Sequence, residues 1–257
     1  MEIIKYDVRE RIGFIQINRP EKRNALNDEV VAGLKKAFRE AEADKHVKVI
    51  VLTGSGSSFC SGADLKYLQK LEAFSLEENI KDSASLMELF KIIYFCKKPV
   101  IAQVNGTALA GGCGLVSVCD FAFSTLEAKF GYTEVRIGFI PAIVTVFLLR
   151  KIGEAKAKRL LLAGEIIDSD TAVNIGLING AVEEEELESC VLEYAQTLIE
   201  QNASTAMEMT KEMIATVQDM SLREALDYAV EKNAKARGTQ DCKKGINAFL
   251  NKEKIRW

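Results

Sequence analysis

Apolar positions along the first half of the chain repeat with two different spacings. Alternating runs at residues 3–8 and 12–18, separated by three charged residues, predict a β-hairpin. Asn27 can cap a helix whose apolar residues recur at helical spacing, namely Val30, Leu34, Ala37, Phe38 and Ala41. A strand is predicted at residues 48–53. This alternation of strands and helices predicts an α/β fold.

The same order of elements recurs in the middle of the chain and then stops. Residues 85–96 show helical spacing, residues 99–104 form an apolar strand pattern, and a glycine-rich turn occupies residues 106–114. From about residue 202 onward only helices are predicted, at residues 203–217, 222–236 and 241–252. We therefore predict two parts: an α/β core over residues 1–200 and a helical region over residues 201–257. The methionines of the helical region favour a core or a subunit interface.

The composition excludes several classes of protein. The chain has 257 residues, 48% of them hydrophobic, and can bury a large core. A formal net charge of -3 without a long basic block argues against a nucleic-acid surface. No apolar run approaches the ~20 residues that span a bilayer. The six cysteines form no C-x-x-C pair, and no secretory leader is evident, so we expect reduced thiols and a cytoplasmic protein.

The single histidine narrows the chemistry further. His46 lies between charged residues just before a strand pattern, which indicates a solvated surface position. Ser-His-Asp catalysis, Cys-His catalysis and the usual zinc sites would all depend on this one residue. If the chain is an enzyme, we therefore expect carboxylates to perform its acid–base work.

Two glycine-containing turns, at residues 61–64 and 110–113, follow strand patterns and precede helices. Backbone N–H groups at the start of a helix can bind an anion, and one such donor can contribute about 3 kcal/mol to an oxyanion transition state. Two tight turns without any function are an equally good interpretation of these residues alone. The turn at residues 54–59 has two glycines of a dinucleotide-binding motif but lacks the third, which argues against that fold.

Short motifs in a fixed order connect these turns with a known family. They are N-R-P and N-A-L-N within residues 18–27, F-C-S-G-A-D-L at 59–65, V-N-G and A-G-G within 104–112, C-D at 119–120 and F-G at 130–131. Together they resemble the crotonase superfamily over nearly the whole chain. The resemblance implies a spiral of repeated ββα units, followed by C-terminal helices that join subunits into homotrimers or hexamers. It also implies acyl-coenzyme A substrates and no separate cofactor, because coenzyme A is part of the substrate.

The resemblance assigns roles to particular residues. The N–H groups of Ala63 and Gly111 match the oxyanion hole for the thioester carbonyl, and Glu134 matches a catalytic glutamate. Matches to positions around coenzyme A are Arg23, Ala25, Leu26, Ala63, Asp64, Leu65 and Lys66, with Phe249 and Lys252 reaching a coenzyme A held by a neighbouring subunit.

One departure from the family pattern affects the mechanism. Hydratases of the family place two glutamates at the substrate double bond, whereas the first of these positions is Gly114 here. Glu134 alone could move one proton between two carbons, which is isomerisation, or perform both steps of a syn hydration or dehydration. A carboxylate on the substrate could also take part, using the room that Gly114 opens.

The segment after Glu134 favours hydration or dehydration. Residues 135–144 resemble the bacterial 3-methylglutaconyl-CoA hydratases of leucine degradation, which also have a small residue at the position of Gly114. We therefore expect a hydro-lyase for a branched or carboxylated enoyl-CoA, with Arg136 or Lys70 as partners for a distal carboxylate. A Δ3,Δ2-enoyl-CoA isomerase is the main alternative. A naphthoate synthase is a less well supported interpretation, because that subgroup tends to lack the glutamate that is present here as Glu134. The absence of a basic, aromatic patch argues against a non-catalytic RNA-binding relative.

Overall fold

Two sheets form the centre of the molecule in the computed structural model, which describes residues 2–257. The larger sheet has the order β1-β2-β3-β5-β7-β10, formed by β1 (Ile4–Arg9), β2 (Ile12–Ile17), β3 (Val49–Gly54), β5 (Val100–Val104), β7 (Phe121–Thr125) and β10 (Gly180–Val182). The smaller sheet has the order β4-β6-β8-β9, formed by β4 (Ser58–Cys60), β6 (Thr107–Leu109), β8 (Lys129–Gly131) and β9 (Ile166–Asp168).

Successive strands enter the two sheets in turn, which produces a spiral. The hairpin β1-β2 is antiparallel, and β3, β5, β7 and β10 then add beside β2 in parallel. β4, β6 and β8 follow β3, β5 and β7 respectively and pair in parallel in the smaller sheet. Each strand–strand–helix unit therefore adds one strand to each sheet, and the expected α/β fold is confirmed.

Helices cover both faces of the larger sheet. The helices of this part of the chain are α1 (Asp28–Ala43), α2 (Leu65–Leu71), α3 (Leu76–Tyr94), α4 (Gly111–Val118), α5 (Ala142–Ile152), α6 (Glu154–Ala163), α7 (Ser169–Asn174) and α8 (Leu187–Gln201), with short 3-10 turns η1 (Pro20–Lys22), η2 (Glu134–Ile137) and η3 (Glu184–Glu186). In β3, Val49 and Val51 face α8, while Ile50 and Leu52 face the main core. Strands buried on both faces explain the continuous apolar runs of the sequence.

Local signals explain where the helices begin. The Asn27 side chain accepts a hydrogen bond from the N–H of Val30, which confirms the predicted cap of α1. α3 begins well before the predicted residue 85, because Ser75 and Glu78 form a capping box at its start. The charged residues before position 85 therefore belong to the exposed first turns of α3, and the predicted start of this helix at residue 85 was wrong.

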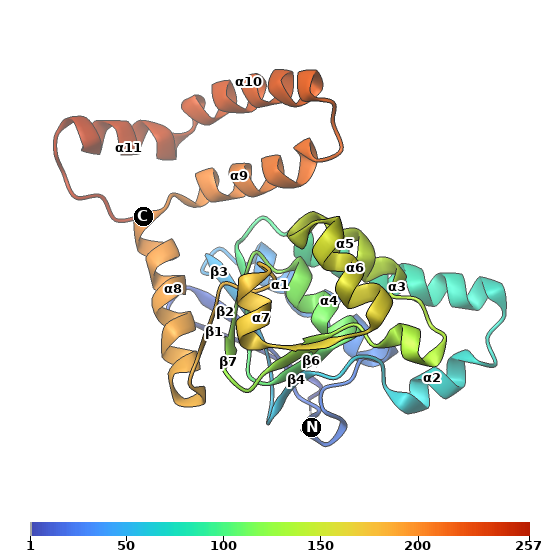
Figure 1. Ribbon diagram of the computed structural model, residues 1–257. Coiled ribbons are helices and arrows are strands. Elements are labelled where there is room, and N and C mark those ends of the chain that lie inside the picture. The colour runs from blue at the N-terminus through green and yellow to red at the C-terminus, as the bar shows by residue number, and fades with distance from the viewer. Residues whose placement is uncertain (1) are drawn as a thin grey trace.

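The last three helices, α9 (Ser204–Val217), α10 (Leu222–Gly238) and α11 (Gln240–Leu250), stand away from the two sheets (Figure 1). α8 ends at Gln201 and connects them to the core, and the division into two domains near that residue stays a prediction. Large apolar residues of α10 and α11, among them Leu222 and Val230, are exposed in the single chain. Across residues 2–257, none of the helices has both the length and the apolar character that crossing a bilayer requires.

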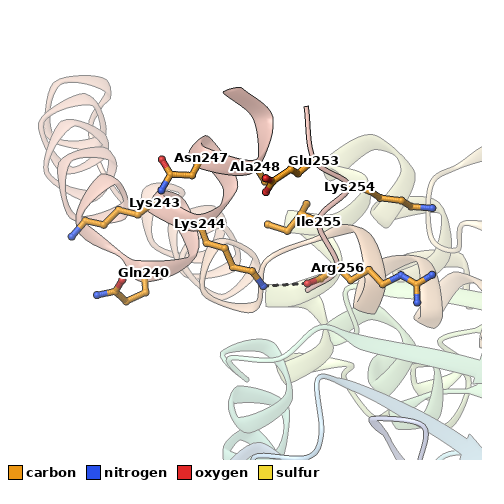
Figure 2. A pocket seen from close by; sticks show the side chains of 9 residues that line it. All are labelled: Gln240, Lys243, Lys244, Asn247, Ala248, Glu253, Lys254, Ile255 and Arg256. Atoms are coloured by element: carbon orange, nitrogen blue, oxygen red, sulfur yellow. Dashed lines mark hydrogen bonds between the residues drawn. The ribbon is translucent and has the colours of Figure 1, made fainter. Parts of the chain in front are cut away.

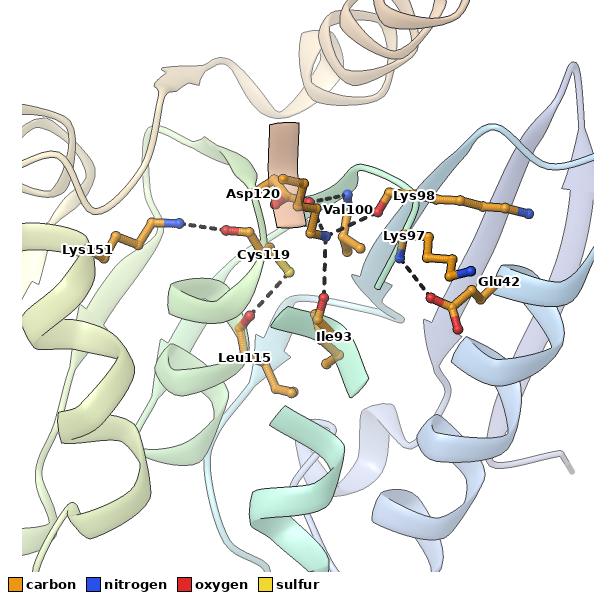
Figure 3. A network of polar contacts seen from close by, with 10 residues as sticks. Glu42, Ile93, Lys97, Lys98, Val100, Leu115, Cys119, Asp120 and Lys151 are labelled. Carbon is orange, nitrogen blue, oxygen red and sulfur yellow. Dashed lines mark hydrogen bonds and ion pairs between the residues drawn. The ribbon is translucent and has the colours of Figure 1, made fainter. Parts of the chain in front are cut away.

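A network of lysines holds α9 against the core (Figure 3). The Lys211 ammonium of α9 lies 2.6 Å from the Asp120 carboxylate and donates to the carbonyl of Ile93 near the end of α3. Lys151 of α5 donates to the carbonyl of Cys119 at the end of α4, at 2.7 Å. Lysines at these positions satisfy carbonyls that a helix end leaves unpaired. The helical region is thus attached directly beside α4.

Candidate active site

The two glycine-containing turns meet in the structure. Hydrogen bonds from the N–H of Leu26 to the carbonyl of Gly62, at 2.7 Å, and from the N–H of Asp64 to the carbonyl of Leu26, at 2.8 Å, pair the first turn with the segment after η1. Gly62 has a φ of 92°, and a Cβ atom there would lie 2.8 Å from the Cβ of Ala110 in the second turn. Glycine therefore permits both the left-handed backbone and the close approach of the two turns.

Ala63 and Gly111 present free donors on these adjoining turns. Within residues 2–257, the backbone N–H groups of Ala63 and Gly111 donate no hydrogen bond to the protein. Gly111 is the first residue of α4, where an unpaired N–H group is expected, and Ala110 before it has a φ of 49°, which is unusual for a residue with a side chain. Two held donors of this kind suit an oxyanion hole, and that role stays a prediction.

Glu134 has the properties of an acid–base group. It is the first residue of η2, three residues after the end of β8, and its Oε2 atom is buried without a hydrogen-bond partner among the described residues. Burial raises the pKa of its carboxyl above the ordinary 4.5. A buried carboxylate without a partner is costly for folding. Glu134 lies three residues after Gly131, whose carbonyl accepts a hydrogen bond from the N–H of Ala110 in the second glycine turn, and this position favours a catalytic role.

The space beside Gly114 is closed, contrary to the expectation that Gly114 opens room for a substrate. A Cβ atom at Gly114 would lie 2.4 Å from Val144 Cγ1 and 2.9 Å from Phe90 Cζ. Both neighbours belong to the buried core. The physical reason is packing: the absent side chain allows α3 and α5 to approach α4 and fill the volume with apolar groups. At this point an apolar wall replaces the first glutamate of the family hydratases.

The residues predicted to contact coenzyme A divide into two groups. Arg23, Leu65 and Lys66 are exposed, Leu65 to 78%, and are available to a ligand. Ala25 and Leu26 are buried in the turn contact described above.

The Asp64 carboxylate is already engaged by the protein. It lies 2.9 Å from Arg19 and accepts a hydrogen bond from the N–H of Lys66, which caps α2. Burial opposes ionisation, but the hydrogen bonds from Arg19 and Lys66 keep the pKa of Asp64 below its usual range. Its side chain therefore stabilises the turn that carries Ala63.

Comparison with known proteins decides the family. Residues 7–257 match the family model described as enoyl-CoA hydratase/isomerase. The chain belongs to the enoyl-CoA hydratase/isomerase family. A putative enoyl-CoA hydratase of Thermus thermophilus is 41% identical over 249 residues, which cover 96% of this chain and 97% of that protein. A crotonyl-CoA hydratase of Syntrophomonas wolfei is 36% identical over 259 residues, covering 98% and 96%.

Solved structures agree with this assignment. The crystal structure of an enoyl-CoA hydratase from Mycobacterium smegmatis aligns with a TM-score of 0.93 and 30% identity, over 100% of this chain and 99% of that one. The predicted crotonase superfamily and its fold are therefore confirmed, and with them the prediction that the chain is an enzyme.

The two predicted contacts with a neighbouring subunit lie far from the rest of the site. Phe249 is 82% exposed, and Lys252 follows it just beyond α11. Figure 1 places α11 at the opposite end of the molecule from α2, so neither residue reaches the glycine turns of its own chain. Their contact with a coenzyme A on another subunit of this family member stays a prediction.

A cavity near the C-terminus is also remote from Glu134. It has a volume of about 490 Å³ and lies between α11 and the last residues of the chain (Figure 2). Its lining is mainly basic and polar, and the Lys244 ammonium of α11 donates across it to the carbonyl of Arg256, at 3.2 Å. A second cavity of about 410 Å³ is apolar and lies between α3, α5 and the end of α9. Among residues 2–257, no group of three or more His, Cys, Asp or Glu side chains is placed to hold a metal ion.

The remaining residues that the sequence analysis considered for a functional role, Lys70, Arg136 and His46, lie on the surface. Lys70 forms an ion pair with Asp28, at 3.6 Å. The side chain of Arg136 packs across Gly164, with Cγ 3.3 Å from the position of a Cβ there. His46 is 91% exposed and pairs with Asp44, which confirms its predicted surface position.

Sequence reasoning missed three residues that shape the site. Arg19 belongs to the N-R-P motif, but its pairing with Asp64 across 45 residues has no local signal. Phe90 and Val144 show only the ordinary helical spacing of core residues, so nothing marked them as neighbours of Gly114.

Proposed function

We propose that this protein is an enoyl-CoA hydro-lyase that uses Glu134 as its single acid–base carboxylate. The observation that carries the proposal is the buried, unpaired Oε2 of Glu134, with a raised pKa, on the segment that follows β8. The free N–H groups of Ala63 and Gly111 support it, because an enolate oxygen needs donors of this kind. No cofactor beyond the coenzyme A of the substrate is proposed.

In the proposed mechanism, the thioester oxygen accepts hydrogen bonds from Ala63 and Gly111. Ionised Glu134 takes a proton from a water molecule while the oxygen of that water bonds to the β-carbon. The electrons of the double bond move toward the thioester. The enolate oxygen is held by the two N–H groups. Glu134 then returns the proton to the α-carbon, so that H and OH add to the same face. The reverse sequence eliminates water from the 3-hydroxyacyl thioester.

For the acyl group, we propose a short enoyl thioester, with a branched or carboxylated substrate such as 3-methylglutaconyl-CoA as the specific candidate. The resemblance of residues 135–144 to enzymes for that substrate is its support. The apolar wall at Gly114 does not favour a carboxylate at that point. Lys70 already pairs with Asp28, whereas Arg136 forms no ion pair within residues 2–257 and is the better partner for a distal carboxylate.

A Δ3,Δ2-enoyl-CoA isomerase is the second candidate function. The specific observation in its favour is the same wall, because it removes the second carboxylate that hydratases of the family use to position water. One glutamate suffices to move a proton between two carbons.

We further propose that the chain assembles as a homotrimer or as a dimer of trimers. The exposed apolar residues of α10 and α11, including Leu222, Val230 and Phe249, support an interface there. Size-exclusion chromatography with light scattering measures the assembly, and a monomer would contradict it. A cytoplasmic location and the absence of a nucleic-acid partner stay predictions.

Turnover by purified wild type, Glu134→Gln and the control Glu127→Gln tests the function. Glu127 is an exposed glutamate near β8, so its variant makes the same chemical change outside the site. The substrates are crotonyl-CoA, 3-methylglutaconyl-CoA, 3-hydroxy-3-methylglutaryl-CoA and a 3-enoyl-CoA. We expect kcat/KM to fall at least ~100-fold in Glu134→Gln and to stay unchanged in the control.

Each other outcome has a definite meaning. Turnover of only the 3-enoyl thioester would establish the isomerase instead of the hydro-lyase. Preference for crotonyl-CoA over the methylglutaconyl pair would remove the branched substrate but keep the hydro-lyase. Full activity of Glu134→Gln, or no turnover of any substrate by the wild type, would refute the proposed function.

A further inference from the structure

The wall at Gly114 lies one turn along α4 from Gly111, whose free N–H group projects from the N-terminal end of that helix. Residues three apart on a helix share a face, and the rise along the axis is about 1.5 Å per residue. Gly114 therefore lies about 4.5 Å along α4 from the expected oxyanion donor. In the crotonase family the side chain at this position faces the double bond of the substrate, so we expect an acyl chain with its thioester oxygen at Gly111 to pass close to it.

Phe90 forms the larger part of that wall. Its ring is fully buried, with Cζ 2.9 Å from the position of a Cβ at Gly114. On its other side the ring meets Phe147 of α5 edge to face, with 6.0 Å between the ring centres. The Phe90 ring thus lies between α4 and Phe147, where α3, α4 and α5 meet.

An apolar cavity lies directly behind this aromatic pair. Phe147 itself lines the cavity of about 410 Å³, together with Met87, Tyr94 and Phe95 of the α3 segment and Ile143 and Val146 of α5. This volume falls within the range of small-molecule sites, about 300–1,000 Å³. Its lining offers what an alkyl chain needs, and the polar groups Lys91, Arg150 and Asp219 are the exceptions.

We propose that Phe90 determines specificity by limiting the length of the acyl chain. This inference rests on the proposed function, since it assumes an acyl-CoA whose thioester lies at Gly111. The Phe90 ring, with Phe147 behind it, stops a linear chain at Gly114. Truncation of the ring opens a space beside Gly114 that reaches Phe147 and admits a longer chain.

Affinity for saturated acyl-CoA thioesters tests the inference without requiring any chemistry. Isothermal titration calorimetry with butyryl-CoA and decanoyl-CoA compares wild type, Phe90→Ala and the milder variants Phe90→Leu and Val144→Ala. The control is Phe95→Ala, which removes a ring from the same cavity on its exposed side. Circular dichroism shows which variants are folded, and the folded ones are then assayed on 2-enoyl-CoA substrates of increasing length.

The expected result is a change in the ratio of the two affinities. Wild type and Phe95→Ala should prefer the short thioester, whereas Phe90→Ala should shift the ratio toward decanoyl-CoA by at least about 10-fold, the effect that a methylene or more has in an apolar pocket. Phe90→Leu and Val144→Ala should shift it in the same direction by less.

Two results would overturn the inference. One is a wild type that already binds decanoyl-CoA more tightly than butyryl-CoA. The other is a set of folded wall variants with the same ratio as the wild type. Because binding is measured separately, lack of turnover in the presence of tight acyl-CoA binding would refute the proposed reaction and leave the Phe90 result to be read independently.

Discussion

A methyl group added at position 114 tests how tightly the wall beside the active site is packed. In Gly114→Ala the new Cβ would lie 2.4 Å from Val144 Cγ1 and 2.9 Å from Phe90 Cζ, so both buried neighbours must move. Overpacking of this kind costs about 1–3 kcal/mol, and a contact this short belongs in the upper part of that range. Alanine gains about 1 kcal/mol over glycine inside a helix, which leaves a net loss of about 1–2 kcal/mol.

The assay is thermal and urea denaturation of purified variants. For a chain of this size, 1 kcal/mol corresponds to about 2–4 °C in Tm, so Gly114→Ala should melt about 2–8 °C below the wild type. Gly238→Ala is the control, because a Cβ at the end of α10 meets no atom within 4 Å. That variant should be as stable as the wild type or slightly more stable.

A double-mutant cycle locates the cause. Val144→Ala removes the atom that lies nearest to the new methyl group, so Gly114→Ala should cost less in that background, with a coupling of about 1 kcal/mol. The reasoning would be refuted if Gly114→Ala behaved like Gly238→Ala, or if its cost were the same with and without Val144. The same packing predicts that Gly114→Glu alone will not restore a second catalytic carboxylate.

Three further predictions follow from charged groups with unusual surroundings. Because burial raises the pKa of Glu134 above 4.5 and only its ionised form can accept a proton, the acid limb of the kcat/KM profile should have its midpoint above pH 4.5. A midpoint below that pH would contradict the assignment. The ion pair with Arg19 lowers the pKa of Asp64 in the folded protein. The ion pair therefore stabilises the fold at pH values above the unfolded pKa of Asp64, and this stabilisation is lost as the pH falls through its folded pKa. Asp64→Asn should lower Tm at pH 7, and the difference in Tm from the wild type should shrink toward strongly acid pH. Lys211→Met leaves Asp120 without its partner in a largely buried site and should cost about 3 kcal/mol in urea denaturation, and recovery of part of that loss by adding Asp120→Asn would identify the ion pair as the cause.

The elements that could be predicted from the sequence are those whose signals are local. The cap at Asn27 and the glycines of the two turns act within a few residues, so the pattern placed α1 and the starts of α2 and α4 correctly. The start of α3 was missed although Ser75 and Glu78 form a local capping box, because the first turns of that helix are polar and show no apolar face. The resemblance to the crotonase superfamily supplied the candidates Ala63, Gly111 and Glu134, which the chemistry of single residues could not have selected.

By itself, the sequence determined the α/β class of the fold, the helices at its C-terminal end, the family, and the single carboxylate that remains at the expected catalytic positions. Only the tertiary structure decided what stands in place of the other carboxylate. The contacts of Gly114 with Phe90 and Val144 join three helices that are distant along the chain. A glycine in the sequence indicates a missing side chain, but whether the vacated volume becomes a pocket or is filled by core residues depends on how closely the neighbouring helices pack.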